Sequence, residues 1–140
     1  VGKHVKTTKI QLLRMNFQCK ELSISDEELG CAVTFSDSKT SEDQFKTIEE
    51  ILNSNEKYLL IQRTYPEDEY ELDYYHIESS ETDTELNSKD KMIVKLSLEK
   101  FEIDWSGDHL EIGLNLTDIE MKNLKEILVT RFNNRIRFIK

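Results

Sequence analysis

The stretch Lys91–Phe132, in which apolar and polar residues alternate as far as Leu116 and then recur at helical spacing, most constrains how this chain folds. A period of two residues buries one face of a β-strand and exposes the other. Successive runs carry apolar residues at that spacing: Met92, Val94, Leu96 and Leu98; Phe101, Ile103 and Trp105; and Leu110, Ile112, Leu114 and Leu116. Ser106-Gly107-Asp108 separates the last two runs, and glycine takes the positive φ that a tight turn requires. The stretch therefore predicts three strands joined by short turns.

A helix is predicted directly after these strands. Thr117-Asp118-Ile119-Glu120 has the capping-box pattern, in which the Thr117 hydroxyl and the Glu120 carboxylate bond backbone amides at the helix start. The apolar residues behind this cap recur at helical spacing and form one stripe: Ile119, Leu124, Ile127, Leu128 and Phe132. Because the stripe and the sheet face each need an apolar partner, we expect the helix to pack across the sheet.

The remainder of the chain predicts further strands and a second helix. The expected strands are Ile10–Cys19, Cys31–Phe35, Lys57–Thr64, Glu69–Glu78 and an edge strand in Arg135–Lys140. The first two should pair as a hairpin across a polar turn at Ser25–Glu28, and apolar residues three and four apart predict a short helix over Glu42–Asn53. Residues 1–9 and 79–91 have few apolar anchors and should be loose or mobile. We thus expect one α+β domain over residues 1–140: an antiparallel β-sheet of about six to seven strands, with a C-terminal helix packed on one face and a short inserted helix.

The charge balance bears on the kind of partner. Among 140 residues, 28 are acidic and 19 basic, which gives a formal net charge of −9. This balance disfavours binding to nucleic acid or to an anionic membrane and suits a basic protein surface, although solubility alone also explains it. No apolar run approaches the ~20 residues of a membrane span, and no hydrophobic leader follows Val1, so we expect a cytoplasmic protein.

The sequence has no recognisable motif of a catalytic, metal or cofactor site. The histidines are His4, His76 and His109, and no His or Cys pair has the spacing of zinc ligands. Cys19 and Cys31 could pair across neighbouring strands, but two cysteines in a chain of this size are more typical of buried, reduced thiols. Neither a G-x-S-x-G motif nor a glycine-rich phosphate loop occurs. We therefore expect no catalysis, no metal and no cofactor.

One segment is a candidate partner-binding surface. Its residues are Glu67, Asp68, Glu69, Tyr70, Glu71, Asp73, Tyr74 and Tyr75. Tyrosine provides contact area at low entropic cost, and carboxylates steer association with a basic partner. In an extended chain Tyr70 and Tyr74 lie on one side, and Tyr75 lies on the other. The alternative interpretation is a solvated edge strand with some of its tyrosines packed inward.

Several blocks that cover most of the chain occur in a characteristic order. They are Gly30-Cys31-Ala32-Val33-Thr34-Phe35-Ser36-Asp37, Tyr58-Leu59-Leu60-Ile61-Gln62-Arg63, Tyr75-His76-Ile77-Glu78, the Lys95–Trp105 strands, and the Leu110–Phe132 strand and helix. In this order the chain resembles the immunity protein 10 family of bacterial polymorphic toxin systems. It departs from the family pattern in the acidic loop after Glu78, which is rich in Ser and Thr instead of Gly, and in the helix expected over Glu42–Asn53.

The resemblance implies a small α+β protein that binds and neutralises a cognate toxin domain without catalysis and so protects the producing cell. The alternative is a small accessory or regulatory domain that binds a different protein, with no toxin involved. Strand addition at the Arg135–Lys140 tail would permit a homo-oligomer, but nothing in the sequence demands one.

Overall fold

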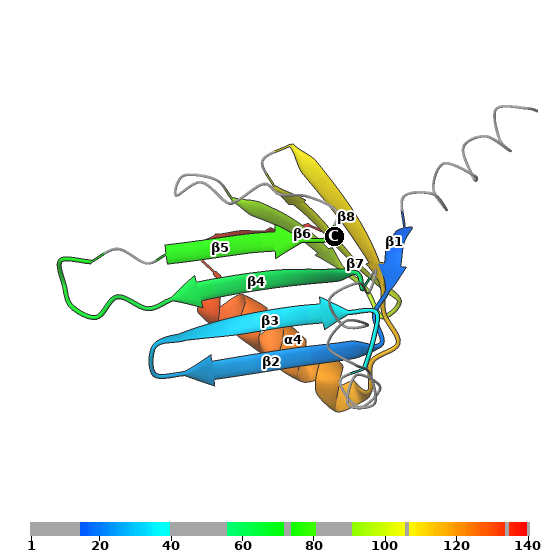
Figure 1. Ribbon diagram of the computed structural model, residues 1–140, viewed down its shortest axis with the longest axis horizontal. Coiled ribbons are helices and arrows are strands. Elements are labelled where there is room, and N and C mark those ends of the chain that lie inside the picture. The colour runs from blue at the N-terminus through cyan, green and yellow to red at the C-terminus, as the bar shows by residue number, and fades with distance from the viewer. Residues whose placement is uncertain are drawn as a thin grey trace, which may run out of the picture.

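The computed structural model describes residues 15–39, 56–71, 74–80, 91–105, 107–133 and 135–139 (Figure 1). These residues form strands and one helix, in the order β1 (Met15–Gln18), β2 (Glu21–Glu27), β3 (Gly30–Ser36), β4 (Tyr58–Thr64), β5 (Tyr74–Ser79), β6 (Met92–Leu96), β7 (Lys100–Trp105), β8 (Asp108–Gly113), α4 (Asp118–Arg131) and β9 (Ile136–Phe138). The α+β class is therefore confirmed. The helix expected over Glu42–Asn53, and the greater part of the loop expected over 79–91, lie outside the described residues.

The strands form two sheets, so the expectation of one sheet with six to seven strands was wrong. A four-stranded antiparallel sheet has the order β2-β3-β4-β5, and a five-stranded mixed sheet has the order β1-β8-β7-β6-β9. The chain passes from one sheet to the other between β1 and β2. There the Cys19 amide donates to the carbonyl of Gly113 in the five-stranded sheet, and the next amide, of Lys20, donates to Ser36 in the four-stranded sheet.

The predicted hairpin partner of β3 was also wrong. β3 pairs with β2, whose end had been assigned to a turn, whereas β1 lies parallel to β8 in the other sheet. β2 is an edge strand, and its apolar residues Leu22 and Ile24 are only partly buried. A short alternation among polar residues is a weak strand signal, which is why the sequence pattern did not reveal it.

The prediction for the closing helix is confirmed, with one exception. At the start of α4 the Glu120 amide donates to Thr117 Oγ1 and the Thr117 amide donates to the Glu120 carboxylate, which completes the capping box. Met121 and Leu124 are buried, as are Ile127, Leu128 and Phe132, but Ile119 is 72% exposed. Ile119 precedes Leu124 by five residues, which places it about 140° around the helix from that residue and off the buried stripe.

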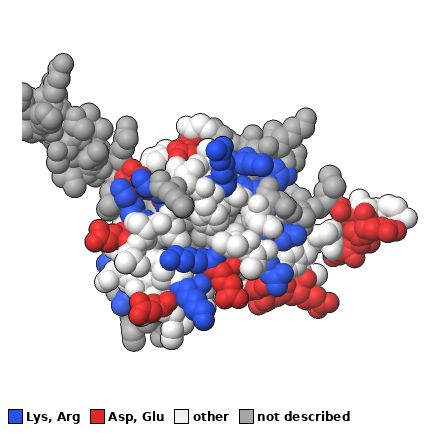
Figure 2. Space-filling view, turned by 180° about the vertical axis from the view of Figure 1, so that it is seen from behind, with Lys and Arg blue, Asp and Glu red and all other residues white. Residues whose placement is uncertain are grey.

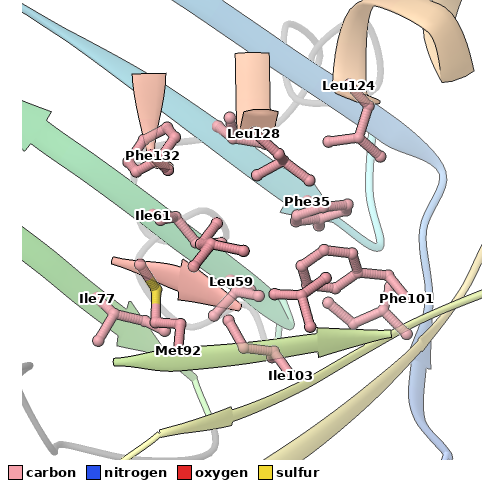
Figure 3. Packing of buried hydrophobic residues seen from close by; sticks show 14 of the residues in the cluster. Phe35, Leu59, Ile61, Ile77, Met92, Phe101, Ile103, Leu124, Leu128 and Phe132 are labelled. Carbon is pink, nitrogen blue, oxygen red and sulfur yellow. The ribbon is translucent and has the colours of Figure 1, made fainter. Parts of the chain in front are cut away.

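The hydrophobic core lies where three walls meet. In Figure 1, α4 passes behind β2 and β3 of the four-stranded sheet, and β6–β8 lie on the β5 side of that sheet. Figure 3 shows one fully buried layer from each wall: Phe35, Leu59, Ile61 and Ile77 from the four-stranded sheet; Met92, Phe101 and Ile103 from the five-stranded sheet; and Leu124, Leu128 and Phe132 from the helix side. The rings of Phe35 and Phe101 lie 4.6 Å apart between centroids and join the two sheets directly.

Smaller sequence expectations are confirmed as well. Cys19 and Cys31 are buried free thiols, and Trp105 is 1% exposed in the core. Gly107 has a φ of 85° in the turn between β7 and β8, and β9 forms an edge of the five-stranded sheet beside β6. In the described part of the chain, no helix has the length and apolar character that crossing a membrane requires.

Candidate partner-binding surface

Two hairpin tips lie side by side at one end of the four-stranded sheet. The β2–β3 turn reaches from Glu27 to Gly30, and Gly30 pairs with Thr64 at the end of β4. Just beyond this pair the Tyr65 amide donates to the Leu29 carbonyl at 3.0 Å, so the β4–β5 connection leaves from the same edge. A Cβ at Gly30 would collide with the carbonyl oxygen of Arg63, so glycine is required for this close approach of β3 and β4.

The first five predicted contact residues, Glu67, Asp68, Glu69, Tyr70 and Glu71, form the exposed β4–β5 turn. They do not begin a strand, as had been expected from Glu69 onward. Asp68 Oδ1 accepts the amides of Tyr70 at 2.8 Å and Glu71 at 3.1 Å, and the Glu71 carboxylate accepts the Glu67 amide at 3.0 Å. These bonds hold a compact turn from which the Tyr70 ring projects with 86% of its surface exposed.

The remaining predicted contact residues divide between surface and core. Tyr74 is 55% exposed on β5, but Tyr75 is 6% exposed and belongs to the core. Its ring lies 6.3 Å from that of Phe132, and the guanidinium of Arg135 lies 5.1 Å from its centroid. Tyr75 alternates with the buried Ile77, so it must face inward, and its assignment to the binding surface was wrong. Asp73 lies outside the described residues.

Acidic side chains gather around the two tips. Figure 2 shows red atoms concentrated at the end where the β4–β5 turn projects. The β2–β3 turn adds Glu27 and Glu28 to the predicted set, together with Leu29, which is 66% exposed. Neither segment 21–29 nor segment 65–71 contains a Lys or Arg. We call the surface formed by Glu27, Glu28, Leu29, Glu67, Asp68, Glu69, Tyr70 and Glu71 the acidic end.

A hollow of about 540 Å³ adjoins the acidic end. It lies on the outer face of the four-stranded sheet, where Gly30 and Ala32 leave room between the longer side chains of Glu27 and Gln62. Its lining includes carboxylate residues, Glu27 and Glu28, and amide and hydroxyl residues, Gln62, Ser25 and Thr64. The hollow is therefore suited to a protruding basic or polar side chain of a partner.

A hydrogen-bonded anchor fixes the base of the β2–β3 hairpin to the helix. The Tyr65 hydroxyl donates to Asp26 Oδ1 at 2.6 Å, and Arg131 Nε donates to Asp26 Oδ2 at 2.8 Å. Arg63 lies 4.9 Å from the Tyr65 ring centroid and donates to the Arg131 carbonyl at the end of α4. The Tyr65 hydroxyl, and then Arg131, hold the pKa of Asp26 below its ordinary value, whereas burial and the bond to Asp26 raise the pKa of Tyr65. These contacts therefore hold the base of the β2–β3 hairpin against β4 and the end of α4.

A second polar group occupies the outer face of β5. His76 Nε2 lies 2.8 Å from Glu78 Oε1, and the Tyr58 hydroxyl donates to Glu78 Oε2 at 2.6 Å. The hydroxyl of Tyr58, followed by His76, lowers the pKa of Glu78. Tyr74 stacks on His76 with centroids 6.5 Å apart. His76 therefore holds the exposed Tyr74 ring in place at the start of β5, next to the β4–β5 turn.

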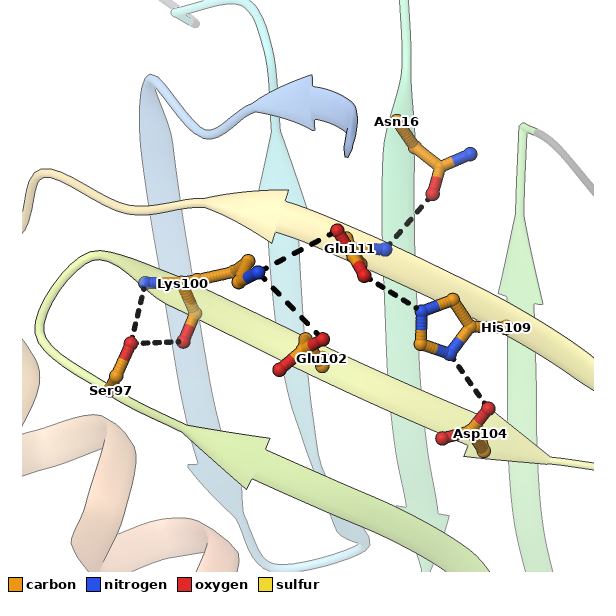
Figure 4. Close-up of polar contacts among 7 residues, drawn as sticks. All are labelled: Asn16, Ser97, Lys100, Glu102, Asp104, His109 and Glu111. Carbon is orange, nitrogen blue, oxygen red and sulfur yellow. Dashed lines mark hydrogen bonds and ion pairs between the residues drawn. The ribbon is translucent and has the colours of Figure 1, made fainter. Parts of the chain in front are cut away.

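A third polar group lies on the outer face of the five-stranded sheet (Figure 4). His109 Nδ1 lies 2.7 Å from Asp104 Oδ1, and His109 Nε2 lies 3.2 Å from Glu111 Oε1. Lys100 Nζ lies 3.7 Å from Glu111 and 3.8 Å from Glu102. Partial burial alone would lower the pKa of His109, but its carboxylate partners outweigh burial and raise it. Burial would raise the pKa of Glu111, yet its neighbours, His109 first, keep that pKa below its usual value.

No family model, curated protein or solved structure matches the chain. Residue chemistry and geometry therefore carry the functional argument. Sequence reasoning missed Glu27, Glu28 and Leu29, although the acidic run Asp26-Glu27-Glu28 was visible. Only the pairing of β3 with β4 brings that run beside the predicted segment.

Proposed function

We propose that this protein is an immunity protein that binds and neutralises a cognate bacterial toxin domain through the acidic end, without catalysis. The observation that carries the proposal is the gathering of six carboxylates around the exposed Tyr70 and Leu29, from two hairpins that are distant in sequence. The resemblance of the chain to the immunity protein 10 family supports the choice of a toxin as the partner.

The arrangement has the physical features of a steered protein interface. Carboxylates on two segments that contain no Lys or Arg, 21–29 and 65–71, create a negative field that accelerates encounter with a basic surface. Tyr70 and Leu29 offer apolar area that becomes buried when the complex forms, and tyrosine is enriched among the residues that contribute most to binding. Toxins that act on nucleic acid need basic clefts, so the expected occupant is a basic toxin surface, with one of its Lys or Arg side chains in the hollow.

The first test is co-expression of this chain with the product of the gene immediately upstream. Cell survival and co-purification are the readouts. Rescue of growth together with a stable complex is the expected result. Toxicity that persists although both proteins are produced would overturn the proposal. A stable complex with a non-toxic partner, formed without any rescue, would favour the accessory domain instead.

A second test locates the interface. Asp68 and Glu71 hold the turn backbone, so the substitutions are restricted to Glu67→Lys and Glu69→Lys, made together. We expect the association rate with the toxin to fall at least about 10-fold at low salt, and the difference to shrink as salt screens the charges. Tyr70→Ala should mainly increase the dissociation rate.

The matched control carries the same charge change elsewhere. Glu99→Lys combined with Glu126→Lys alters an exposed turn and the exposed face of α4. The Leu114 amide donates to the Glu99 carbonyl, and the Cys19 amide donates to the carbonyl of the adjacent Gly113. The Lys20 amide then donates to Ser36 at the end of β3 far from Gly30, so Glu99 lies toward the opposite end of the four-stranded sheet. An equal loss of association rate in both double variants would show that net charge alone matters and that the acidic end is not the interface.

A further inference from the structure

The outer face of the five-stranded sheet holds a compact set of ligand atoms that the proposed function does not use. The β7–β8 register places Glu102 directly opposite Glu111 and Asp104 directly opposite His109. Because residues two apart share a face, all four side chains stand on the same side of the hairpin. One ligand atom from each of Glu102, His109 and Glu111 lies within 4.8 Å of the other two.

Lys100 and His109 offset only part of the negative charge of this group, which comes from the three carboxylates of Glu102, Asp104 and Glu111. Two carboxylates directly opposite each other in a sheet repel, and the Glu111 side chain is 8% exposed, where an uncompensated charge is costly. The nearest lysine, Lys100, keeps its ammonium 3.7 Å from Glu111 and 3.8 Å from Glu102, which is longer than a hydrogen bond. A divalent cation between the carboxylates would neutralise both of them.

The imidazole is already held as a metal ligand requires. Asp104 bonds His109 Nδ1, which leaves Nε2 facing Glu111, and a carboxylate on the second ring nitrogen is the usual support of a zinc-bound histidine. Two ligands at ordinary zinc distances and a tetrahedral angle lie roughly 3.3 Å apart. The observed separation between Nε2 and Glu111 Oε1 is 3.2 Å. The Glu102 carboxylate oxygen lies within 4.8 Å of both of these atoms. A small movement of the Glu102 side chain would bring that oxygen to the distance that zinc ligands require.

We propose that Glu102, His109 and Glu111 form a binding site for a divalent transition-metal ion of the zinc class, with water as the fourth ligand. One nitrogen and two carboxylate oxygens favour zinc over calcium or magnesium, which prefer all-oxygen sites. Lys100 is the resident counter-charge, and its long, partly exposed side chain swings into solvent when the ion binds. This site is independent of the acidic end and of any toxin.

The experiment is zinc titration by calorimetry, with cobalt absorption as a second readout, on protein that carries no polyhistidine tag. We expect one ion per chain and tetrahedral cobalt bands. His109→Gln and Glu111→Gln should weaken zinc binding at least about 100-fold, and Asp104→Asn, which removes only the support, about 10- to 100-fold. Lys100→Gln should act in the opposite direction and tighten binding, because it removes the competing cation.

The chain supplies a matched control in His76 and Glu78. They repeat the His-x-Glu spacing on the other sheet, where His76 Nε2 lies 2.8 Å from Glu78 Oε1, but their partners on β4 are Gln62 and Leu60, so β4 places no second carboxylate opposite the pair. His76→Gln should leave zinc binding unchanged. Circular dichroism confirms that each variant is folded before titration. The proposal is overturned if the folded protein binds no zinc, or if binding survives both His109→Gln and Glu111→Gln.

Discussion

The contact between Phe35 and Phe101 gives a direct test of how the two sheets face each other. Both side chains are fully buried, and their ring centroids are 4.6 Å apart. Phe35→Leu and Phe101→Leu each remove a ring and leave a branched apolar side chain, and each should lower the free energy of unfolding by about 1–2 kcal/mol. Because the rings touch, the double variant should lose less than the sum of the two, by about 0.5–1.5 kcal/mol.

The assay is urea unfolding followed by the fluorescence of Trp105, the only tryptophan, and by far-UV circular dichroism. The tryptophan is 1% exposed, so its emission should change when the core opens. Coincidence of the two transitions is required before free energies are compared. Losses that add within about 0.3 kcal/mol would refute the direct contact, and with it the way the five-stranded sheet is docked.

A control cycle pairs Phe101→Leu with Ile136→Val. Phe101 pairs with Leu96 on β6, and Ile136 pairs with Met92, four residues earlier on the same strand. At ~4.8 Å per strand and ~3.3 Å per residue, Phe101 and Ile136 are roughly 16 Å apart. Their effects should therefore add.

Further expectations follow from the helix, the hairpin anchor and the thiols. Leu124→Ala should cost about 2–5 kcal/mol of unfolding free energy, whereas Ile119→Ala should change it by less than about 0.5 kcal/mol, both measured by urea unfolding; an equal cost would contradict the orientation of α4. The tyrosine hydroxyl, followed by the arginine, lowers the pKa of Asp26 from its ordinary value of 3.8, so the stability that this carboxylate contributes is present above that value and is lost as pH falls through the folded-state pKa. The stability difference between wild type and Asp26→Asn should accordingly shrink between pH 6 and pH 2, and a constant difference would exclude the anchor. Burial raises the pKa of both Cys19 and Cys31, so a thiol reagent at pH 8 should modify them only as fast as the protein opens, and rapid reaction in the native state would contradict their burial.

Much of the local structure could be predicted from residue order alone. Each of β6, β7 and β8 overlaps a run whose alternation marked it as a strand, β4 lies within the predicted strand Lys57–Thr64, and the Thr117–Glu120 cap marked the start of α4. These predictions succeed because side-chain period and capping are local properties, set by residues within one or two turns of each other. The same locality explains the errors on faces: Leu98, which is 75% exposed, continues the alternation beyond the end of β6 at Leu96, and Ile119 was assigned by helical spacing alone. Tyr75 faces inward, on the side opposite Tyr74, yet was counted with the contact residues.

The candidate sites depend on pairings that the residue order does not contain. The acidic segment 67–71 was recognisable, but Glu27 and Glu28 join it only because β3 pairs with β4. The group of Glu102, His109 and Glu111 likewise arises from the β7–β8 register, in which a shift by one residue would turn the side chains of one strand to the opposite face.

By itself the sequence determined the α+β class, the inward face of most strands, the position and cap of the closing helix, and the acidic, tyrosine-bearing segment. The tertiary structure alone decided that the strands divide into two sheets, that β1 and β2 belong to different ones, and which charged side chains become neighbours. The physical reason is that periodicity reports burial of a residue's own side chain. In contrast, many strands have similar apolar faces, so the periodicity of one strand does not specify which strand it pairs with. The pairing is determined only when the whole core packs together.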